Sequence, residues 1–409
     1  MRRDGRRGAG AERRRGGGAR PAASAPRRGG TPGSGTAASG RAAEAGRRLL
    51  RWFRRAKRDL PWRGTRDPYR IWVSEVMLQQ TRVAVVLPHY ERFLERFPTV
   101  RELAAAGEDQ VLSSWSGLGY YGRARQLHRA AREICARPGG AFPRAEREAR
   151  ALPGVGPYTA AAVLSIAHGA RLPVLDGNAV RVLSRLFGER GDAGRAEVRA
   201  RLLRLAGEVM GRRPPGGMNQ AVMELGALLC SPRAPSCGEC PLAGGLCAAE
   251  EQGLQEELPR KAPRAPRRTV LFAAALLGRR GKLLLVREAR GGFVRGMWQP
   301  PAAETEEGEG AEAALRRALR RLGVAAGPLR RAGEVRHAIL NRDLRVEAWR
   351  GAPRSVRSAG APRGTQIGWF APEEAERLPL SSLARKLLRL AGSRPAAPHG
   401  APSISRKRA

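Results

Sequence analysis

The sequence predicts two domains, a mostly α-helical one followed by a smaller α+β domain, and three observations support this. The chain has 409 residues, more than one hydrophobic core normally serves, so two domains with flanking tails are expected. Apolar residues recur at helical spacing almost without interruption from Ala42 to about Leu229. From Thr269 this helical period gives way to short apolar segments separated by turn residues, which indicates β-strands.

The first domain, residues 42–249, begins with a helix whose apolar residues Leu49, Trp52 and Phe53 share one face. Pro61 ends that helix, because proline lacks an N–H and clashes with the preceding turn. The same periodicity predicts further helices at residues 69–86, 90–97, 101–106, 109–115, 123–136, 145–151, 159–168, 178–187, 196–210 and 218–229.

The second domain, residues 269–391, begins with strands at 269–277 and 282–286 that are joined like a hairpin. We expect a helix at 311–322, strands near 333–340, 343–349 and 366–370, and a last helix at 380–391. The segment 250–268 between the domains is polar and proline-rich, which is typical of a linker.

Two basic tails flank these domains. Residues 1–41 consist mainly of Gly, Arg, Ala, Pro and Ser, so we expect a disordered basic arm that either holds DNA non-specifically or reflects compositional drift. Residues 392–409 are expected to form a disordered basic tail of similar composition.

The charge balance favours a polyanionic partner. Lys and Arg number 76 against 37 Asp and Glu, a formal net charge of +39. Part of this excess is attributed to a GC-rich coding bias, but a surplus of this size still favours nucleic acid. The longest apolar runs are too short to span a bilayer, and the Arg-rich N-terminus lacks the apolar segment of a secretory signal.

Four of the five cysteines form a cluster with the pattern C-x6-C-x2-C-x6-C: Cys230, Cys237, Cys240 and Cys247. This density indicates a reducing compartment and a metal centre, either tetrahedral zinc or a [4Fe–4S] cluster, and the spacing alone leaves both open. Cys135 lies far away in a helical segment and is expected to be a packed thiol.

Residues 152–168 combine a glycine turn with an apolar helix. Residues 152–159 read LPGVGPYT, in which Gly154 and Gly156 permit a tight turn before the helix. The free amides at a helix start form an anion site that suits a phosphate. An ordinary turn would explain the motif equally well in isolation. In a strongly basic helical domain it favours a hairpin that grips the DNA backbone.

Two carboxylates have the character needed for glycosidic bond cleavage. Glu75 is the lone acid in the apolar segment IWVSEVML, residues 71–78, where burial would raise its pKa and keep it protonated as a general acid. Asp176 precedes Gly177, Asn178 and an amphipathic helix, so it is also a candidate N-cap. Glycosidic cleavage typically uses one protonated and one ionised carboxyl group.

These motifs occur in one order over about half of the chain: EVMLQQT at 75–81, GLGYY at 117–121, the hairpin, LDGN at 175–178 and the cysteines. Together with PWR at 61–63 they resemble the helix-hairpin-helix DNA glycosylase superfamily and, within it, the MutY family of adenine DNA glycosylases. The resemblance implies a mostly α helix-hairpin-helix glycosylase domain with an iron–sulfur cluster loop, one [4Fe–4S] cluster rather than zinc, and removal of adenine mispaired with 8-oxoguanine or guanine after the base is flipped from the duplex.

The resemblance also implies roles for individual residues. Glu75 would protonate the adenine ring, Tyr158 would position Glu75, Asp176 would stabilise the sugar cation, and Asn178 would orient Asp176 and the water. The residues that match wedges inserted beside the mispair are Gln80, Leu118 and Tyr120, and Arg63 matches a residue of the adenine pocket. A strand-nicking relative has a lysine at the position of Tyr158, so a monofunctional glycosylase is expected.

The second domain resembles the Nudix-like C-terminal domain of the same family, through GGFVRGMWQPP at residues 291–301. The helix that would hold Mg²⁺ in a hydrolase reads LRRALRR at 315–321, and basic side chains cannot ligate a divalent cation. We therefore expect this domain to bind rather than hydrolyse.

Two positions depart from the family pattern. The last two cysteines are separated by one residue more than usual, and Gly244 and Gly245 are available to absorb it. The family's Phe-Ser-His reader of 8-oxoguanine is replaced by Ile339, Leu340 and Asn341, which predicts weaker recognition of the oxidised base.

The sequence thus predicts a monofunctional base-excision-repair adenine DNA glycosylase. The alternatives are a mismatch or oxidised-pyrimidine glycosylase of the same superfamily and a non-catalytic lesion-binding protein. The expected partner is double-stranded DNA with an adenine mispair, without a membrane; downstream abasic-site repair enzymes are further expected partners of a monomer. We expect a cytoplasmic, nucleoid-associated protein, with a nuclear location as the alternative if the source is eukaryotic.

Overall fold

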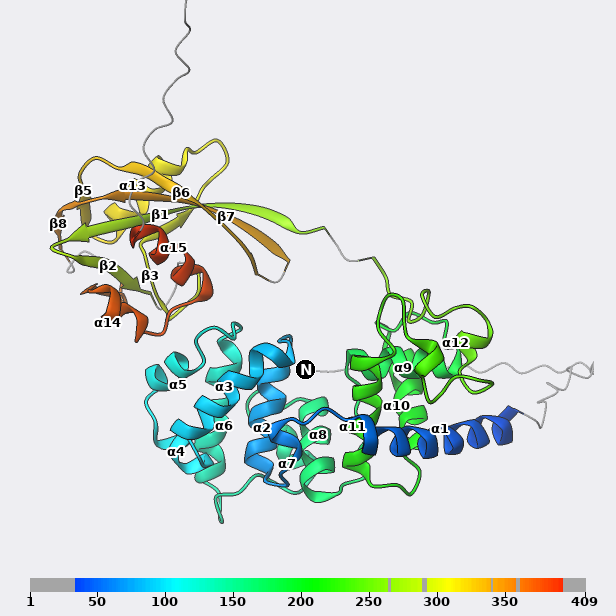
Figure 1. The fold of residues 1–409 in the computed structure, drawn as a ribbon. Helices are drawn as coiled ribbons and strands as arrows, with labels where there is room; N and C mark the ends of the chain where they lie inside the picture. Colours follow the sequence, from blue (N-terminus) through cyan, green and yellow to red (C-terminus); the bar gives the residue numbers. More distant parts are fainter. Residues whose placement is uncertain (1–33, 264–265, 289–292, 340, 358–360, 393–409) are drawn as a thin grey trace, which may run out of the picture.

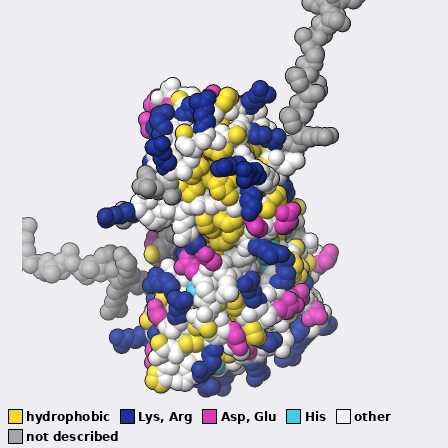
Figure 2. Space-filling view, turned by 90° about the vertical axis from the view of Figure 1, so that its left-hand side faces the viewer, with side chains coloured by type: hydrophobic (Ala, Val, Ile, Leu, Met, Phe, Trp, Pro, Cys, Tyr) yellow, Lys and Arg dark blue, Asp and Glu magenta, His cyan; other side chains and the backbone are white. Residues whose placement is uncertain are grey.

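The computed structural model describes residues 34–263, 266–288, 293–339, 341–357 and 361–392. They form a helical domain and a C-terminal domain built on a sheet (Figure 1). In these ranges no helix is both long and apolar enough to cross a membrane. Lys and Arg side chains are spread over both domains on the face seen in Figure 2, so the positive charge is not confined to the tails.

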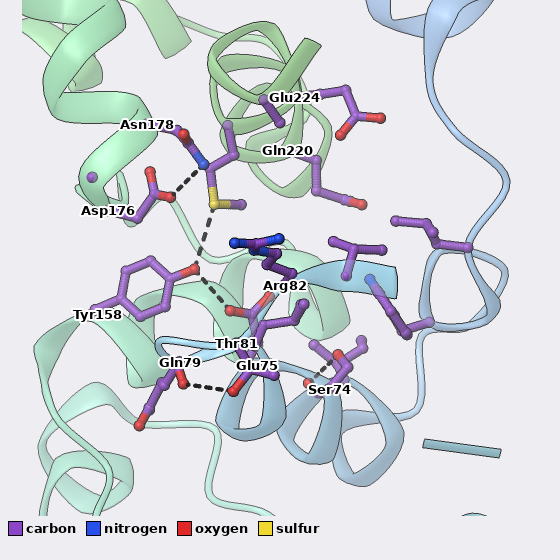
Figure 3. Close-up of a pocket in the computed structure, with 18 of the residues that line it drawn as sticks. Ser74, Glu75, Gln79, Thr81, Arg82, Tyr158, Asp176, Asn178, Gln220 and Glu224 are labelled. Carbon is purple, nitrogen blue, oxygen red and sulfur yellow. Dashed lines mark hydrogen bonds between the residues drawn. The ribbon is translucent and has the colours of Figure 1, made fainter. Parts of the chain in front are cut away.

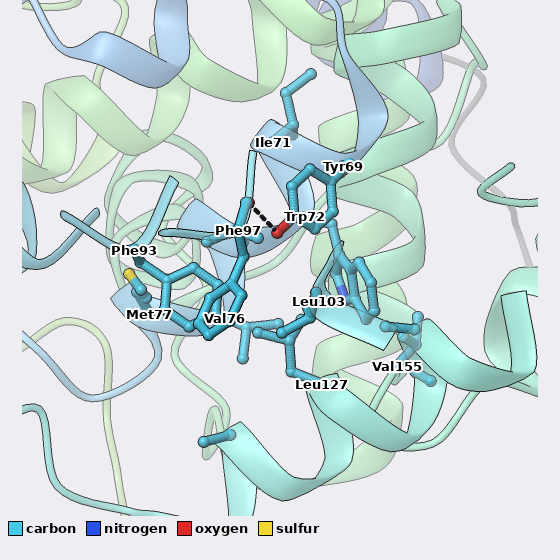
Figure 4. Packing of buried hydrophobic residues seen from close by; sticks show 14 of the residues in the cluster. Tyr69, Ile71, Trp72, Val76, Met77, Phe93, Phe97, Leu103, Leu127 and Val155 are labelled. Atoms are coloured by element: carbon cyan, nitrogen blue, oxygen red, sulfur yellow. Dashed lines mark hydrogen bonds between the residues drawn. The ribbon is translucent and has the colours of Figure 1, made fainter. Parts of the chain in front are cut away.

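The helical domain contains two hydrophobic cores, one on either side of a cavity. The first core is built by η1 (Pro61–Arg63), α2 (Pro68–Leu78), α3 (Val83–Arg96), α4 (Val100–Ala105), α5 (Glu108–Ser114), α6 (Gly122–Cys135), α7 (Glu146–Arg150) and α8 (Pro157–His168). Figure 4 shows its aromatic centre around Trp72, Phe93 and Phe97, where the Tyr69 hydroxyl donates to the Phe97 carbonyl at 2.7 Å.

The second core is built by helices from both ends of the domain. It is formed by α1 (Ser34–Ala56), α9 (Gly177–Phe187), α10 (Ala196–Met210) and α11 (Pro215–Leu228), with the cysteine loop, η2 (Cys237–Glu239) and α12 (Ala248–Glu251) packed on them. Leu49 and Phe53 of α1 are buried here, as their spacing predicts. The first and last parts of the domain therefore form one unit that faces the first core.

Three sequence-based boundaries need correction. The expected helix 69–86 is broken, because α2 ends at Leu78 and α3 starts at Val83. Helix α1 begins at Ser34, inside the segment predicted to be a disordered arm, while residues 1–33 lie outside the described residues, as does the tail 393–409. The start of the expected linker 250–268 packs on the helical domain: Leu258 is buried, and its carbonyl accepts a bond from Arg185 Nε at 2.9 Å.

The C-terminal domain is a sheet covered on both faces by helices. Its strands are β1 (Arg268–Arg279), β2 (Lys282–Arg287), β3 (Trp298–Gln299), β4 (Ala302–Glu304), β6 (Arg330–Ile339), β7 (Arg342–Gly351) and β9 (Gln366–Phe370). The order is β3-β2-β1-β7-β6, with β4 paired to β1 and β9 to β2. A separate pair joins β5 (Val324–Ala326) to β8 (Pro353–Val356).

The apolar run in β1 is explained by burial on both faces of this sheet. Alternate residues such as Val270 and Phe272 pack against α15 (Ser382–Gly392), while Ala273 and Ala275 pack against α13 (Ala311–Arg321). Side chains of a strand alternate between faces, so two covering helices require a continuous apolar strand. The short helix α14 (Pro372–Glu376) follows β9.

The two domains share a buried contact next to the loop 117–121. Met297 of the C-terminal domain is fully buried in the first core of the helical domain. The carbonyl of Leu380 accepts bonds from the Tyr121 hydroxyl at 2.8 Å and from Ser116 Oγ at 3.1 Å. An ion pair joins Arg287 to Asp109 at 2.6 Å. The C-terminal domain is therefore anchored to α5 and α6.

Met297→Ala should lower the free energy of unfolding of the helical domain by about 2–5 kcal/mol, because it empties a filled core position. Urea denaturation followed by circular dichroism at 222 nm measures this, since most helices belong to that domain. Met297→Leu keeps the volume and should cost less than about 1.5 kcal/mol. An Ala variant as stable as the parent would show that Met297 does not hold the domains together.

Candidate active site

A cavity of about 770 Å³ lies between the two cores of the helical domain. Figure 3 shows four of the predicted residues around it: Glu75 from α2, Tyr158 from α8, and Asp176 and Asn178 at the start of α9. Arg63, Gln80 and Tyr120 line the same cavity. The fold thus brings together residues that are up to about a hundred positions apart in the sequence.

Glu75 is a buried carboxyl group in the apolar helix α2. Glu75 is 6 % exposed, and desolvation by burial raises the pKa of its carboxyl group to about 7. The Tyr158 hydroxyl donates to Glu75 Oε2 at 2.8 Å, which opposes this rise, whereas the charge of Asp176 adds to it. A carboxyl group with a pKa near the working pH can hold a proton and release it, as a general acid must.

Asp176 is both the N-cap of α9 and a wall of the cavity. Its Oδ1 accepts from the backbone N–H of Ala179 at 2.7 Å, and its Oδ2 accepts from Asn178 Nδ2 at 3.1 Å. The two roles that the sequence left open, cap and cavity residue, therefore coexist.

Arg63 lies in the cavity wall, where it is bound to a second acid that the sequence analysis missed. Its guanidinium makes two bonds of 2.7 Å to the carboxylate of Glu224 on α11, and Arg58 also binds this carboxylate. Burial alone would raise the pKa of Glu224, but the hydrogen bonds from Arg63 and Arg58 lower it to about 2. Glu224 carries the same signal as Glu75, a lone acid in an apolar helix.

Two of the three expected wedge residues are available at the rim, and one is not. Gln80 and Tyr120 are exposed, Tyr120 by 44 %, and line the cavity. Leu118 is 5 % exposed, packs in the first core and does not line the cavity. Its role as a wedge stays a prediction, and that role requires the Leu118 side chain to leave this core when DNA binds.

The hairpin at residues 152–168 has the conformation that its glycines predict. Gly154 has φ +74°, and a Cβ there would lie 2.6 Å from Cβ of Gln126. Gly156 is the N-cap of α8 and is exposed. Helices α7 and α8 with this turn form a helix–hairpin–helix, and its phosphate contacts stay a prediction.

The four clustered cysteines line one cavity on the second core, together with Arg185. Arg185 is buried and places Nη1 3.2 Å from Cys230 Sγ. Gly244 and Gly245 have φ of +71° and +82°, so the loop takes up its extra residue at glycines, as expected. Cys135 lies elsewhere, with Sγ 3.7 Å from the Val100 carbonyl, consistent with a packed thiol.

One helix connects the cysteine loop to the cavity. Arg181 of α9 donates from Nη2 to Asn178 Oδ1 at 2.8 Å and from Nε to the Cys230 carbonyl at 2.7 Å. One turn further along α9, Arg185 binds the same cysteine and the carbonyls of Ser231 and Pro232. The position of the catalytic-site residue Asn178 and that of the cysteine loop are therefore linked by α9.

The reader loop of the C-terminal domain is described only in part. Ile339 ends β6 with its side chain packed against that domain's core, so it is not free to act as a wedge. Asn341 is exposed at the turn of the β6–β7 hairpin, and Leu340 lies outside the described residues. A groove beside the hairpin is lined by Arg336, Arg345 and Lys386, which the sequence analysis did not single out.

The basic helix α13 forms internal ion pairs in place of an acidic metal site. Arg317 binds Glu309 at 2.7 Å and Glu306 at 3.3 Å, and Arg321 binds the buried Glu288. Glu288, Glu306 and Glu309 are therefore paired with arginines, and the expectation that this domain binds rather than hydrolyses stays a prediction.

Relatives of known activity match most of this chain. Residues 73–208 match the family described as HhH-GPD superfamily base excision DNA repair protein, and residues 272–390 match the NUDIX domain family. Adenine DNA glycosylase of Homo sapiens is 35 % identical over 403 residues, covering 84 % of this chain and 73 % of the human protein. The enzyme of Rattus norvegicus is 34 % identical over 404 residues, covering 84 % and 77 %.

The chain belongs to the adenine DNA glycosylase family. The same enzyme of Schizosaccharomyces pombe is 38 % identical over 226 residues, covering 50 % of this chain and 49 % of the yeast protein. Membership confirms the predicted fold class and the predicted activity, a DNA N-glycosylase that removes adenine. The alternative of a non-catalytic lesion-binding protein is thereby excluded.

Tyr158→Phe should move the alkaline limb of the pH–rate profile to higher pH. In the parent enzyme the second-order rate constant should fall as pH rises through about 7, because Glu75 must be protonated to act. Removing the Tyr158 hydroxyl takes away a bond that favours the carboxylate, so the pKa of Glu75 rises.

Single-turnover base release checks this prediction when it is measured from pH 5 to 9 with enzyme in excess of the DNA but below saturation. Glu75→Gln is the matched control, which should bind DNA but lose roughly 10²–10⁴ in rate at every pH. A limb that stays in place or moves to lower pH in Tyr158→Phe would contradict the assignment of Glu75 as the acid.

Proposed function

We propose that this adenine DNA glycosylase acts on adenine opposite 8-oxoguanine or guanine and leaves the DNA strand uncut. The observation that carries the proposal is the buried Glu75, whose pKa is near 7 and which is bonded to a tyrosine hydroxyl, with Asp176 lining the same cavity. This pair matches the two carboxyl groups that glycosidic cleavage requires.

In the proposed mechanism Glu75 donates a proton to a ring nitrogen of the flipped adenine, so that the base leaves neutral when the C–N bond breaks. Asp176 stabilises the positive charge that develops on the sugar, and Asn178 keeps its carboxylate oriented through the 3.1 Å bond. The residue beside Glu75 is a tyrosine rather than a lysine, so no amine is available there for a Schiff base with the sugar.

The ion pair of Glu224 and Arg63 favours adenine over thymine in the same cavity. Adenine presents an amino donor and a ring-nitrogen acceptor on one edge. The ionised Glu224 carboxylate can accept from the amino group, and the Arg63 guanidinium can donate to the nitrogen. Thymine presents a carbonyl in place of the amino group, which a buried carboxylate would repel.

A [4Fe–4S] cluster is the proposed occupant of the cysteine loop. Its proposed ligands are the four thiols that line one cavity, and a buried arginine lies beside one of them, which suits an anionic thiolate-ligated group. The family resemblance, rather than the spacing of the cysteines, favours the cluster over zinc; when bound, the cluster would cross-link the loop that packs on α9.

The C-terminal domain is the proposed reader of the base opposite adenine. With a partly buried Ile339 and an exposed Asn341 in place of the family's aromatic, hydroxyl and imidazole groups, we expect a narrow preference for 8-oxoguanine over guanine. Duplex DNA as the partner of a monomer, later abasic-site repair enzymes, and a cytoplasmic, nucleoid-associated location stay predictions.

Single-turnover assays on duplexes with adenine opposite 8-oxoguanine, guanine, cytosine and thymine test the proposal. Release should be rapid for the first two, and the strand should break only after alkali. The variant Ile339→Phe, Leu340→Ser, Asn341→His should raise the ratio of the first two rates roughly two- to tenfold, the value of one hydrogen bond. Equal release from all four duplexes would contradict the mispair specificity.

Protein purified without oxygen should contain iron and sulfide and no stoichiometric zinc. Elemental analysis and visible absorbance measure this directly. Cys237→Ser should lose iron, whereas Cys135→Ser should retain it, because Cys135 lies away from the cavity. One zinc and no iron per chain would overturn the cluster assignment.

A further inference from the structure

Arg123 lies behind the two loops that carry the exposed rim residues. Gln80 belongs to the first wedge loop, residues 79–82, and Tyr120 to the second wedge loop, residues 117–121. Arg123 is in the first turn of α6, lines the same cavity and is half-buried. None of the motifs in the sequence analysis includes it.

The guanidinium holds the first wedge loop through main-chain oxygens. Nη1 donates to the carbonyls of Val76 at 2.7 Å and Met77 at 2.9 Å and to that of Gln79, while Nη2 donates to Thr81 Oγ1 at 3.2 Å. The last carbonyls of a helix have no partner within it. Arg123 therefore caps the end of α2, the point at which the chain turns into the wedge loop.

The same guanidinium holds the second wedge loop. Nη2 also donates to the carbonyls of Leu118 at 3.2 Å and Gly119 at 3.3 Å. Its central carbon lies 5.4 Å from the ring centroid of Tyr120 and 5.5 Å from that of Trp115, within cation–π range. One side chain thus contacts both loops and the ring of one wedge residue.

The charge of Arg123 has no acidic partner among the described residues. All of its hydrogen-bond acceptors are neutral oxygens, and its burial lowers the pKa of the guanidinium to about 10. Removing a cation from water without a counter-charge is costly. The hydrogen bonds and cation–π contacts of the guanidinium offset this cost, and these contacts lie on or beside the two wedge loops.

Both wedge residues also need to be held, because their backbones are strained. Gln80 has φ +58° and Tyr120 has φ +47°, a region that residues other than glycine rarely adopt. Such conformations persist when the surrounding structure fixes them. The guanidinium contacts the residue before and the residue after Gln80, and the residue directly before Tyr120.

We propose that Arg123 is a positioning residue that sets the two wedge loops at one fixed spacing, so that Gln80 and Tyr120 enter the DNA stack together when adenine leaves it. The inference rests on the proposed function, because that function makes Gln80 and Tyr120 the residues that insert into the DNA stack. Lysine cannot replace arginine here, because a single ammonium group cannot reach oxygens on both loops in the geometry of the guanidinium fork.

The test compares Arg123→Lys with the parent on two substrates. On a duplex with adenine opposite guanine, single-turnover release should fall roughly tenfold or more, the scale of one lost stacking contact. On a duplex with adenine opposite an abasic-site analogue, the base is already unpaired and flips at lower cost, so the loss should be roughly threefold or less. Arg132→Lys is the matched control, because Arg132 of α6 also forks to carbonyls, those of Ala104 and Ala106.

A double-mutant cycle separates positioning from general stability. In the background Gln80→Ala, Tyr120→Ala, the further change Arg123→Lys should have little additional effect, because the side chains it positions are absent. Thr81→Val, which removes one bond to Arg123 and leaves the arginine intact, should give a smaller defect with the same substrate dependence.

Equal losses on both substrates, or full additivity in the cycle with a matching fall in Tm, would overturn the proposal and leave Arg123 a purely structural residue. A failure of the proposed mispair specificity would appear in the parent enzyme and not in the comparison of Arg123→Lys with it. If the parent does not favour the two mispairs, the ratio between paired and unpaired adenine still reports on Arg123.

Discussion

A carboxyl group buried at the junction of two hydrophobic cores is the constraint on which this site depends. Glu75 and Glu224 are both buried, in apolar helices on opposite walls of one cavity, yet the pKa of one is about 7 and that of the other about 2. The difference comes from their partners, because Glu224 is held by two arginines and Glu75 by one tyrosine hydroxyl. These partners suit Glu75 to the proposed proton donation and keep Glu224 a carboxylate near neutral pH.

Helix α9 fixes the position of the Asp176 carboxyl group relative to the cysteine loop, residues 230–247. Asp176 caps its first turn, Arg181 bonds to Asn178 on one side and to the Cys230 carbonyl on the other, and Arg185 is buried against the same cysteine. A displacement of the cysteine loop would therefore move the arginines and, with them, the first turn of α9. The cysteine loop, although remote from the cavity, is thereby mechanically coupled to Asp176 and Asn178.

The sequence was most informative where a local pattern decides the structure. Helical periodicity, the capping position of Asp176 and the glycine turn at Gly154 each follow from near neighbours, and the structure has all three. The break between α2 and α3 was not predictable, because the carbonyls that end α2 are satisfied by Arg123, far along the chain. The burial of Leu118 was not predictable for a similar reason, because its place in the core depends on how several helices meet. Glu224 was missed although it gave the same signal as Glu75.

The contact between the domains determines where a reader of the opposite base can act. The Leu380 carbonyl binds Ser116 and Tyr121, which flank the loop carrying Tyr120, and Met297 fills the core next to it. That loop is thus held from inside by Arg123 and from outside by the C-terminal domain. In Figure 1 the β6–β7 hairpin of this domain points toward the helical domain. A base contacted by the hairpin and a wedge inserted by the loop therefore belong to one connected unit. Under the proposed function, a domain anchored in this way can influence base flipping through the loop itself, even where Leu340 replaces the family's polar serine.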